Sequence, residues 1–163
     1  MSAVRQANPA SWQLLPMAID DIPELLQIEQ QVYEFPWTVG IFRDCLTVGY
    51  SGWIARDASG ALLGYALMSM AAHEAHLLNL CVAPHFQRRG LAQALVRQVV
   101  QIAAHARAER LLLEVRASNK PALKLYRRLQ FEQIGLRKGY YPASAGREDA
   151  RVLALELLEW TPD

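Results

Sequence analysis

Apolar residues follow two different spacings along the chain, and the change of spacing marks where strands give way to helices. Leu77 to Val82 form a short apolar run that ends at Ala83-Pro84, as is typical of a buried strand. Between Leu91 and Ala106 apolar residues return every three or four positions, so one face of a helix is apolar. The centre of the chain is therefore predicted to be a strand, a turn and a long helix.

The same spacings predict the elements before this centre. Residues 12–18 are a strand candidate, and Asp20 or Asp21 can cap a helix that ends before Pro36. Thr38 can cap a second, shorter helix. The chain is thus expected to begin with a strand and two helices.

The rest of the chain is predicted to be mostly strands. The expected elements are a hairpin of strands 51–56 and 61–70, a strand at 110–115, a helix capped by Asn119, and strands at 132–137 and 151–158 joined by a polar loop with Tyr140, Tyr141 and Gly146. The order β-α-α-β-β-β-α-β-α-β-β predicts an α/β protein in which a mixed central sheet carries helices on both faces.

Composition and charge indicate a globular protein rather than a polyanion binder. The 163 residues are 52% hydrophobic and 20% charged, with a formal net charge of +1. This balance argues against nucleic acid as a partner, although Arg88-Arg89 and Arg127-Arg128 are local basic spots. We expect residues 1–11 to be a flexible tail and residues 12–163 to be a single domain.

The cysteines and histidines predict no metal site. Cys45 and Cys81 lie in unrelated apolar contexts, and the four histidines form no ligand pair at helical spacing. The N-terminal stretch lacks the apolar segment of a signal peptide, and no apolar run approaches membrane-spanning length. We expect reduced thiols, no membrane partner and a cytoplasmic location.

The turn before the central helix, Gln87-Arg88-Arg89-Gly90-Leu91-Ala92, carries the clearest candidate chemistry. A glycine-bearing turn that opens a helix presents unpaired backbone N–H groups and the positive end of the helix dipole, which suits a pyrophosphate. The dinucleotide fingerprint needs three glycines, and a P-loop needs a following Gly-Lys-Ser/Thr, so the turn matches neither. Taken alone, a solvated structural turn explains these residues at least as well.

The motifs that follow change this balance. Glu114-Val115-Arg116-Ala117-Ser118-Asn119 ends one predicted strand, and Leu125-Tyr126 lies in the next helix. Together with the turn, they resemble the GNAT superfamily of acetyl-CoA-dependent N-acetyltransferases, over roughly residues 15–157. The chain further resembles the branch that acetylates the N-terminal alanine of a small-subunit ribosomal protein, at Phe35-Pro36-Trp37, Asn79, Tyr140-Tyr141-Pro142 and Gly146-Arg147-Glu148-Asp149-Ala150.

The resemblance implies the GNAT fold, acetyl-CoA as co-substrate, a ribosomal-protein N-terminal peptide as substrate, and roles for individual residues. Glu114 would be the general base and Tyr126 the general acid. Coenzyme A binding is implied for Leu80, Cys81, Val82, Arg88, Arg89, Gly90, Leu91, Ala92, Gln93 and Asn119. Substrate binding is implied for Phe35, Trp37, Glu74, Tyr140 and Tyr141.

Without the resemblance, several of these residues have structural alternatives. A carboxylate at Glu114 on a buried strand is either functional, solvated at the strand end, or paired with Arg110 or Arg116. Phe35-Pro36-Trp37 fits a hydrophobic hinge as well as a substrate-lining corner. Tyr126 fits a core tyrosine whose hydroxyl is hydrogen-bonded.

Further expectations concern the backbone and one thiol. In the family, the strand matching Leu77–Val82 carries a bulge that frees backbone N–H groups near Cys81 and Val82 for the acetyl carbonyl. Cys81 itself is a poor nucleophile candidate, because apolar neighbours raise the pKa of a thiol. Ala92 replaces the commoner glycine, which the family pattern allows. Gln130 replaces a usual glycine, at a cost of about 1 to 2 kcal/mol if the position is left-handed.

Two rival functions remain open at this point. One is a GNAT enzyme that acetylates a small amine or a lysine side chain. The other is a non-catalytic regulatory module that only binds acetyl-CoA. The presence of both Glu114 and Tyr126 argues against the second, because binding alone requires neither.

Overall fold

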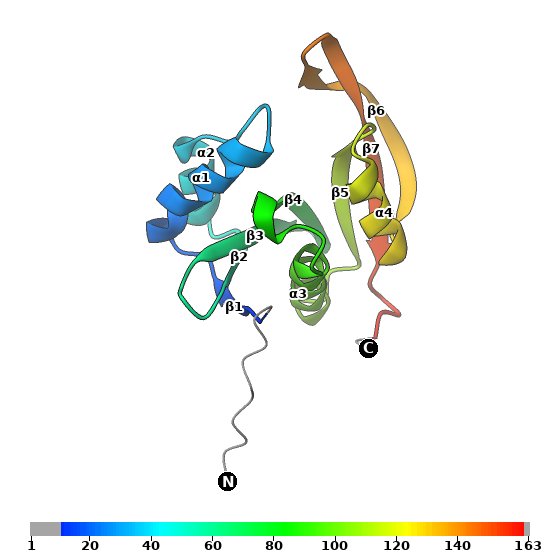
Figure 1. Cartoon of the computed structure of the whole chain (residues 1–163). Helices are drawn as coiled ribbons and strands as arrows, with labels where there is room; N and C mark the ends of the chain where they lie inside the picture. The colour runs from blue at the N-terminus through cyan, green and yellow to red at the C-terminus, as the bar shows by residue number, and fades with distance from the viewer. Residues whose placement is uncertain (1–10, 162–163) are drawn as a thin grey trace.

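Residues 11–161 are described by a computed structural model, in which the strands form one mixed, seven-stranded sheet of order β1-β2-β3-β4-β5-β7-β6 (Figure 1). The strands are β1 (Gln13–Pro16), β2 (Ser51–Arg56), β3 (Leu62–Ala71), β4 (Glu74–Val82), β5 (Arg110–Arg116), β6 (Glu132–Ala143) and β7 (Gly146–Glu156). The helices are α1 (Ile22–Val32), α2 (Val39–Thr47), α3 (Leu91–His105) and α4 (Lys120–Arg128), with short 3-10 turns η1 (Ile19–Asp21) and η2 (Pro84–Phe86). The predicted order of elements is confirmed. Apart from its last residue, the predicted tail 1–11 lies outside the described residues.

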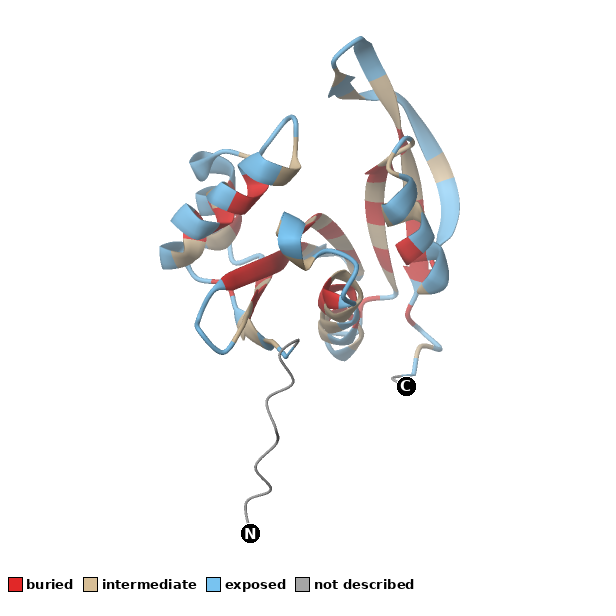
Figure 2. Cartoon of the chain, in the orientation of Figure 1, coloured by how far each residue is buried: buried red, intermediate tan, exposed pale blue. Residues whose placement is uncertain are grey.

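Helices cover both faces of the sheet, as predicted. Leu25 of α1 and Phe42 of α2 pack in one buried cluster with Tyr65 of β3. Leu95 of α3 and Leu125 of α4 pack in a second cluster. Figure 2 shows the buried positions gathered along the strands and on the inward sides of the helices. The two clusters share the sheet as a common wall, which fixes the strands between them.

The central sheet opens between β4 and β5. Leu67 of β3 pairs with Asn79 and Met68 pairs with Leu77, so Leu78 is an extra residue that forms a bulge in β4. The parallel ladder of β4 and β5 ends at the pair Leu77–Leu113, beyond which the strands diverge (Figure 1). The predicted bulge and the splaying of this strand are confirmed.

The end of the chain differs from the prediction. Residues 132–137 and 151–158 were expected to be separate strands joined by a long polar loop. Instead, β6 and β7 continue as a hairpin of 12 and 11 residues, with Tyr140 and Tyr141 on β6. Register shifts between Gln133 and Gly135 and between Arg137 and Tyr141 interrupt the alternation along β6. Because this hairpin is largely exposed, its strands need no regular apolar pattern, and the sequence showed none.

The end of α4 confirms the expectation for Gln130. This residue has a φ of 73°, the left-handed conformation that glycine adopts without strain. Phe131 N then donates to Tyr126 O at 3.0 Å, which closes the helix and seats Phe131 in the core. Within residues 11–161, no helix is long and apolar enough to cross a membrane.

Candidate active site

The opening between β4 and β5 exposes one edge of the β4 backbone. Ala83 N donates to Leu63 O of β3 at 2.8 Å. Because N–H groups alternate between the two sides of a strand, those of Cys81 and Ala83 face β3, whereas those of Leu80 and Val82 face the opening. Val82 thus fits the predicted role, and Leu80 rather than Cys81 supplies the second N–H group.

The carbonyl groups on this edge already have partners. The Tyr33 hydroxyl donates to Leu80 O, and Gln87 Nε2 donates to Val82 O at 3.1 Å. The described part of β5 pairs with β4 only as far as Leu77, so it offers no strand partner to the two N–H groups. Two donors therefore point into the opening, where they can bind a carbonyl oxygen or an oxyanion.

The predicted pyrophosphate turn lies at one end of this opening and has the expected backbone. Gly90 is the N-cap of α3 and has a φ of 84°. A Cβ at this position would meet no atom within 4 Å, so a ligand can approach the backbone closely. Arg88 also has a positive φ, of 64°. Such a turn directs successive N–H groups to one side, which suits an anion.

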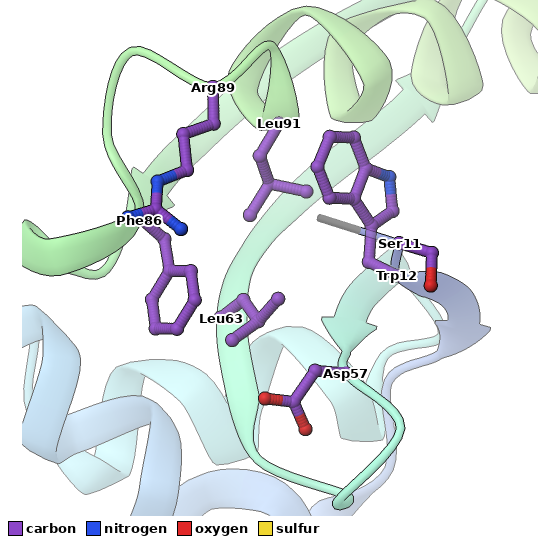
Figure 3. Close-up of a pocket in the computed structure, with 7 residues that line it drawn as sticks. All are labelled: Ser11, Trp12, Asp57, Leu63, Phe86, Arg89 and Leu91. Atoms are coloured by element: carbon purple, nitrogen blue, oxygen red, sulfur yellow. The ribbon is translucent and has the colours of Figure 1, made fainter. Parts of the chain in front are cut away.

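The two adjacent arginines of the turn diverge. The Arg89 guanidinium lies 5.4 Å from the ring centre of Phe86. Figure 3 shows Arg89 with Leu63, Leu91 and Trp12, which line the same small hollow. The hollow has a volume of about 30 Å³, so it has room for little more than one water molecule. Arg88 instead lines a groove beside α4. Arg88 is thus the arginine that faces outward from the turn on the α4 side.

Glu114 is the first residue of β5 beyond the end of the β4 ladder. Its side chain is only 14% exposed and accepts a hydrogen bond of 2.7 Å from Arg137 of β6. Glu114 therefore forms an ion pair, as one of the alternatives predicted, but its partner is Arg137 rather than Arg110 or Arg116. The pKa of the Arg137 guanidinium is raised by this hydrogen bond and by the charge of Glu114. Arg137 is half-exposed, so solvent screens the pair and leaves it easy to exchange.

Tyr126 lies on α4 with its ring buried against Phe131, at 5.4 Å between ring centres. Burial raises the pKa of its hydroxyl, and the nearby Tyr141 raises it further. Burial likewise raises the pKa of Tyr33, and electrostatic interactions with Cys81 and Tyr126 raise it further. Tyr126 thus interacts electrostatically with Tyr33, whose hydroxyl donates to Leu80 O on the exposed edge of β4, and with Tyr141 of the hairpin. A raised pKa favours hydrogen-bond donation over complete proton transfer.

An arginine joins the predicted substrate corner to the hairpin. The Arg116 guanidinium lies 5.5 Å from the Phe35 ring centre and 4.5 Å from that of Tyr141. The pKa of Tyr141 is raised to about 12, first by burial and then by the charge of Glu114. Tyr140 lies beside it, and its pKa is raised chiefly by a hydrogen bond to Glu114. Tyr140 and Tyr141 therefore lie beside the Glu114 carboxylate. Arg116 links Phe35 to Tyr141, although these two aromatic residues are more than a hundred positions apart in the sequence.

Trp37 has a more structural position than Phe35. Its ring packs edge-on against Phe42 at 5.2 Å, and its backbone N–H donates to Glu29 Oε2 at 3.1 Å. Phe35 is 43% exposed. The packing of Trp37 agrees with the hydrophobic hinge, and the substrate-lining role stays a prediction for the exposed Phe35.

The buried carboxylate of Glu29 was not singled out from the sequence. It is 1% exposed and accepts hydrogen bonds from Asn79 Nδ2 at 2.6 Å and from the Tyr65 hydroxyl at 2.9 Å, besides that from Trp37 N. This carboxylate therefore ties α1 to the residue after the bulge and to the substrate corner. A signal was available, because Glu29 falls four residues after Leu25 on the apolar face of α1.

The remaining predicted residues differ in their placement. Asn119 caps α4 by accepting from Ala122 N at 3.3 Å, as expected. Burial raises the pKa of the Cys81 thiol to about 12, which agrees with the poor nucleophile that was predicted. Glu74 pairs with Arg110 at 2.7 Å, at the start of β4, four residues before the bulge. It lies apart from the other proposed substrate residues. Among residues 11–161, no three His, Cys, Asp or Glu side chains are arranged to hold a metal ion.

The geometry suits transfer of an acyl group from a donor held by its phosphates. The open turn at Gly90 can hold a pyrophosphate, and the N–H groups of Leu80 and Val82 can stabilise an oxyanion. The Glu114 carboxylate can take a proton from an incoming amine. These groups line one opening in the sheet, as the reaction requires.

Comparison with known proteins gives a consistent result. Residues 17–131 match the family described as "Acetyltransferase (GNAT) family". The "[Ribosomal protein bS18]-alanine N-acetyltransferase" of Escherichia coli strain K12 is 35% identical over 137 residues, which cover 84% of this chain and 92% of that protein. The enzyme of the same name from Salmonella typhimurium is 35% identical over 141 residues, which cover 86% and 95%.

Solved structures agree with the sequence comparison. The crystal structure of the ribosomal-protein-S18-alanine N-acetyltransferase from Escherichia coli superimposes with a TM-score of 0.86 and 31% identity, covering 94% of this chain and 98% of that one. Arabidopsis thaliana NAA60 in complex with acetyl-CoA superimposes with a TM-score of 0.83 and 20% identity, covering 90% and 99%. The second likeness concerns the fold alone.

Proposed function

The chain belongs to the acetyltransferase (GNAT) family, and from this membership we propose that it transfers the acetyl group of acetyl-CoA to the N-terminal alanine of a small-subunit ribosomal protein, in the cytoplasm. The observation that carries the proposal is the position of Glu114, which follows the last β4–β5 pair and faces Tyr140 and Tyr141. The relatives named for this activity support the choice of substrate.

The donor would be held along the exposed edge of β4. In this proposal the turn from Arg88 to Ala92 binds the pyrophosphate, and Gly90 leaves room for it against the backbone. The N–H groups of Leu80 and Val82 bind the acetyl carbonyl and strengthen that contact as negative charge develops on the oxygen. In this proposal Asn119, the cap of α4, and Gln93, in the first turn of α3, add polar contacts to the donor.

The amine would enter between the aromatic corner and the hairpin. An N-terminal amine has a pKa of about 7.7 to 8.0, so at neutral pH most of it is protonated and a base is needed. Glu114 receives that proton, either directly or through water, after the amine has displaced the exposed Arg137. Phe35, Tyr140 and Tyr141 position the first residues of the peptide.

The departing thiolate would be stabilised by Tyr126. A tyrosine of ordinary pKa is already a weaker acid than a thiol, and burial weakens Tyr126 further. In this proposal its hydroxyl therefore donates a hydrogen bond to the sulfur, and solvent completes the protonation. Attack of the amine forms the C–N bond, cleavage of the tetrahedral intermediate breaks the C–S bond, and the products are the acetylated peptide and coenzyme A.

Mass spectrometry tests the proposal against its rivals. The protein is incubated with acetyl-CoA and a peptide that begins with alanine and contains one internal lysine. Acetylation of the α-amine is the expected result. Acetylation of the lysine would instead indicate a side-chain acetyltransferase, and the absence of any product would indicate a module that only binds the donor.

A further inference from the structure

The C-terminal end of α1 holds two consecutive residues of β4. The Tyr33 hydroxyl donates to Leu80 O. Glu29 Oε1 accepts from Asn79 Nδ2 at 2.6 Å. Tyr33 caps α1, and its backbone N–H donates to Glu29 O at 2.9 Å, so the two side chains leave α1 about one helical turn apart. Two hydrogen bonds therefore join one end of α1 to one short stretch of β4.

This stretch is the part of β4 that the sheet supports least. It follows the bulge at Leu78 and lies beyond Leu77, the last residue that pairs with β5. On its other side β3 continues to pair with it as far as Val82. A bulge disrupts the ladder locally, so a strand that is paired on one side of a bulge is not held firmly by its ladder. Contacts from outside the sheet then decide how firmly its free N–H groups are held.

Tyr33 acts on the residue that offers the first of these N–H groups. In a strand, the N–H and C=O groups of one residue point to the same side. Leu80 O, which Tyr33 binds, therefore lies on the same open edge as the Leu80 N–H group. Burial raises the pKa of Tyr33, so its hydroxyl keeps the proton that it donates. Tyr33 thus takes the place of the strand partner that β5 no longer provides here.

Glu29 is a rigid support for the preceding residue. Besides the bond from Asn79, it accepts from the Tyr65 hydroxyl at 2.9 Å and from Trp37 N at 3.1 Å. A carboxylate that is 1% exposed and has three donors from separate elements has little freedom to turn. It therefore fixes the Asn79 side chain. The peptide group that contains the Leu80 N–H begins at Asn79, so this anchor also bears on its direction.

We propose that Tyr33 and Glu29 are positioning residues, which keep the Leu80 N–H group directed at the acetyl carbonyl. The inference rests on the proposed function, in which this N–H group binds the carbonyl oxygen. Both side chains act through β4 rather than on the reacting atoms. Removal of an oxyanion donor costs about 10²- to 10³-fold in kcat, so misplacement of the donor should cost less, about 10- to 100-fold.

Tyr33→Phe tests the first anchor, because it keeps the ring and removes only the donor. Its kcat with acetyl-CoA and the alanine peptide is expected to fall by about 10- to 100-fold, while the affinity for coenzyme A stays the same. Tyr50→Phe, at an exposed tyrosine beyond α2, is the matched control and should keep the wild-type kcat. A wild-type kcat in Tyr33→Phe, with or without a lower melting temperature, would overturn its assignment.

Infrared spectroscopy observes the positioned contact itself. The protein is loaded with acetyl-CoA that carries ¹³C at the acetyl carbonyl, without peptide. A hydrogen bond polarises the C=O bond and lowers its stretching frequency, so the frequency should be higher in Tyr33→Phe than in the wild type. A tyrosine that only packs would leave the frequency unchanged. A lower kcat at the wild-type frequency would also contradict the proposal, because the hydroxyl would then act on the peptide or on the leaving group.

Asn79→Ala tests the second anchor, because it cuts the contact between Glu29 and β4. Tyr65→Phe is its matched control, since it also removes one donor to Glu29 but leaves the contact with Asn79 in place. Both variants are expected to melt at a lower temperature. Only Asn79→Ala is expected to raise the carbonyl frequency and to lower kcat about 10- to 100-fold. Equal changes of frequency and kcat in the two variants would reduce Glu29 to a stabilising residue and overturn its assignment.

The measurements separate this inference from the proposed function. The infrared comparison needs bound acetyl-CoA but no peptide. A raised frequency in Tyr33→Phe, in a protein that fails to acetylate the alanine peptide, would support the positioning role and refute the proposed substrate. Failure of the wild type to bind acetyl-CoA would refute both.

Discussion

Leu77 and Leu113 form the last pair of the parallel ladder between β4 and β5. In β4 the bulge follows Leu77 directly. In β5 the residue that follows Leu113 is Glu114. The end of one ladder thus places a free backbone edge opposite a carboxylate. The proposed chemistry depends on this single departure from regular strand pairing.

Gly90→Asp is predicted to abolish coenzyme A binding. The new carboxylate would stand where the pyrophosphate approaches the backbone and would repel it. Isothermal titration calorimetry measures the loss directly, and circular dichroism checks that the fold is intact.

Gly49→Asp is the matched control for this variant. Gly49 also has a positive φ, of 87° against 84° at Gly90, and a Cβ there would likewise meet no atom within 4 Å. The two substitutions therefore impose similar backbone strain. Similar loss of coenzyme A affinity in both variants would show that strain, rather than the site, explains the effect.

Phe35→Ala and Trp37→Ala are predicted to fail in different ways. Phe35 is exposed and contacts Arg116 across the opening, so its loss is expected to raise the KM for the peptide severalfold with little change in melting temperature. Trp37 packs on Phe42, so its loss is expected to destabilise the fold by about 2 to 3 kcal/mol. Peptide kinetics and thermal melts of both variants check this division, and identical profiles would refute it.

Tyr126→Phe is predicted to lower kcat by about 10²- to 10⁴-fold while acetyl-CoA affinity stays the same. The ring keeps its contact with Phe131, so the melting temperature should change little. Because burial raises the pKa of the hydroxyl, we expect stabilisation of the leaving sulfur to dominate over proton transfer. A thioester with a more acidic leaving thiol should then recover part of the lost rate. A wild-type kcat in this variant would show that Tyr126 only packs in the core and does not act on the leaving group.

Glu29→Gln is predicted to destabilise the protein. The carboxylate accepts from three donors, and a glutamine would turn its own NH₂ group toward one of them. A cost of about 2 kcal/mol follows, which lowers the melting temperature by about 4 to 8 °C. Glu24→Gln, on the exposed side of the same helix, should change it much less. Calorimetric melts of the two variants compare them, and an unchanged melting temperature for Glu29→Gln would be contrary to the expectation.

Local patterns in the sequence were sufficient for most of the fold. The periodicity of Leu91 to Ala106 predicted α3, and the cap at Asn119 predicted α4, because both depend on neighbouring residues. The outer part of the β6–β7 hairpin, between residues 137 and 151, was predicted as a loop, because an exposed ladder leaves no apolar alternation to detect. Only the backbone hydrogen bonds of the folded chain define these strands.

The candidate site was predictable where a motif carries it and unpredictable where it depends on distant contacts. The turn at Gly90 was found from its residues alone. The pairing of Glu114 with Arg137 was not, because the two residues meet only when β6 folds beside β7 and β5. The contacts of Glu29 could not be predicted for the same reason. Its place on an apolar helix face was visible, but its three donors come from β3, β4 and the corner.

The rate of α-amine acetylation by Glu114→Gln, measured against pH with an alanine-initiated peptide, tests the central claim most directly. Glu156→Gln, an exposed residue at the far end of β7, is the control and should retain the wild-type rate. At pH 7 the Glu114→Gln rate should fall by about 10²- to 10⁴-fold. The deficit should shrink above about pH 8, where the peptide amine loses its proton without help. A wild-type rate at pH 7 in Glu114→Gln would contradict the assignment of this carboxylate as the base and, with it, the site proposed between β4 and β5.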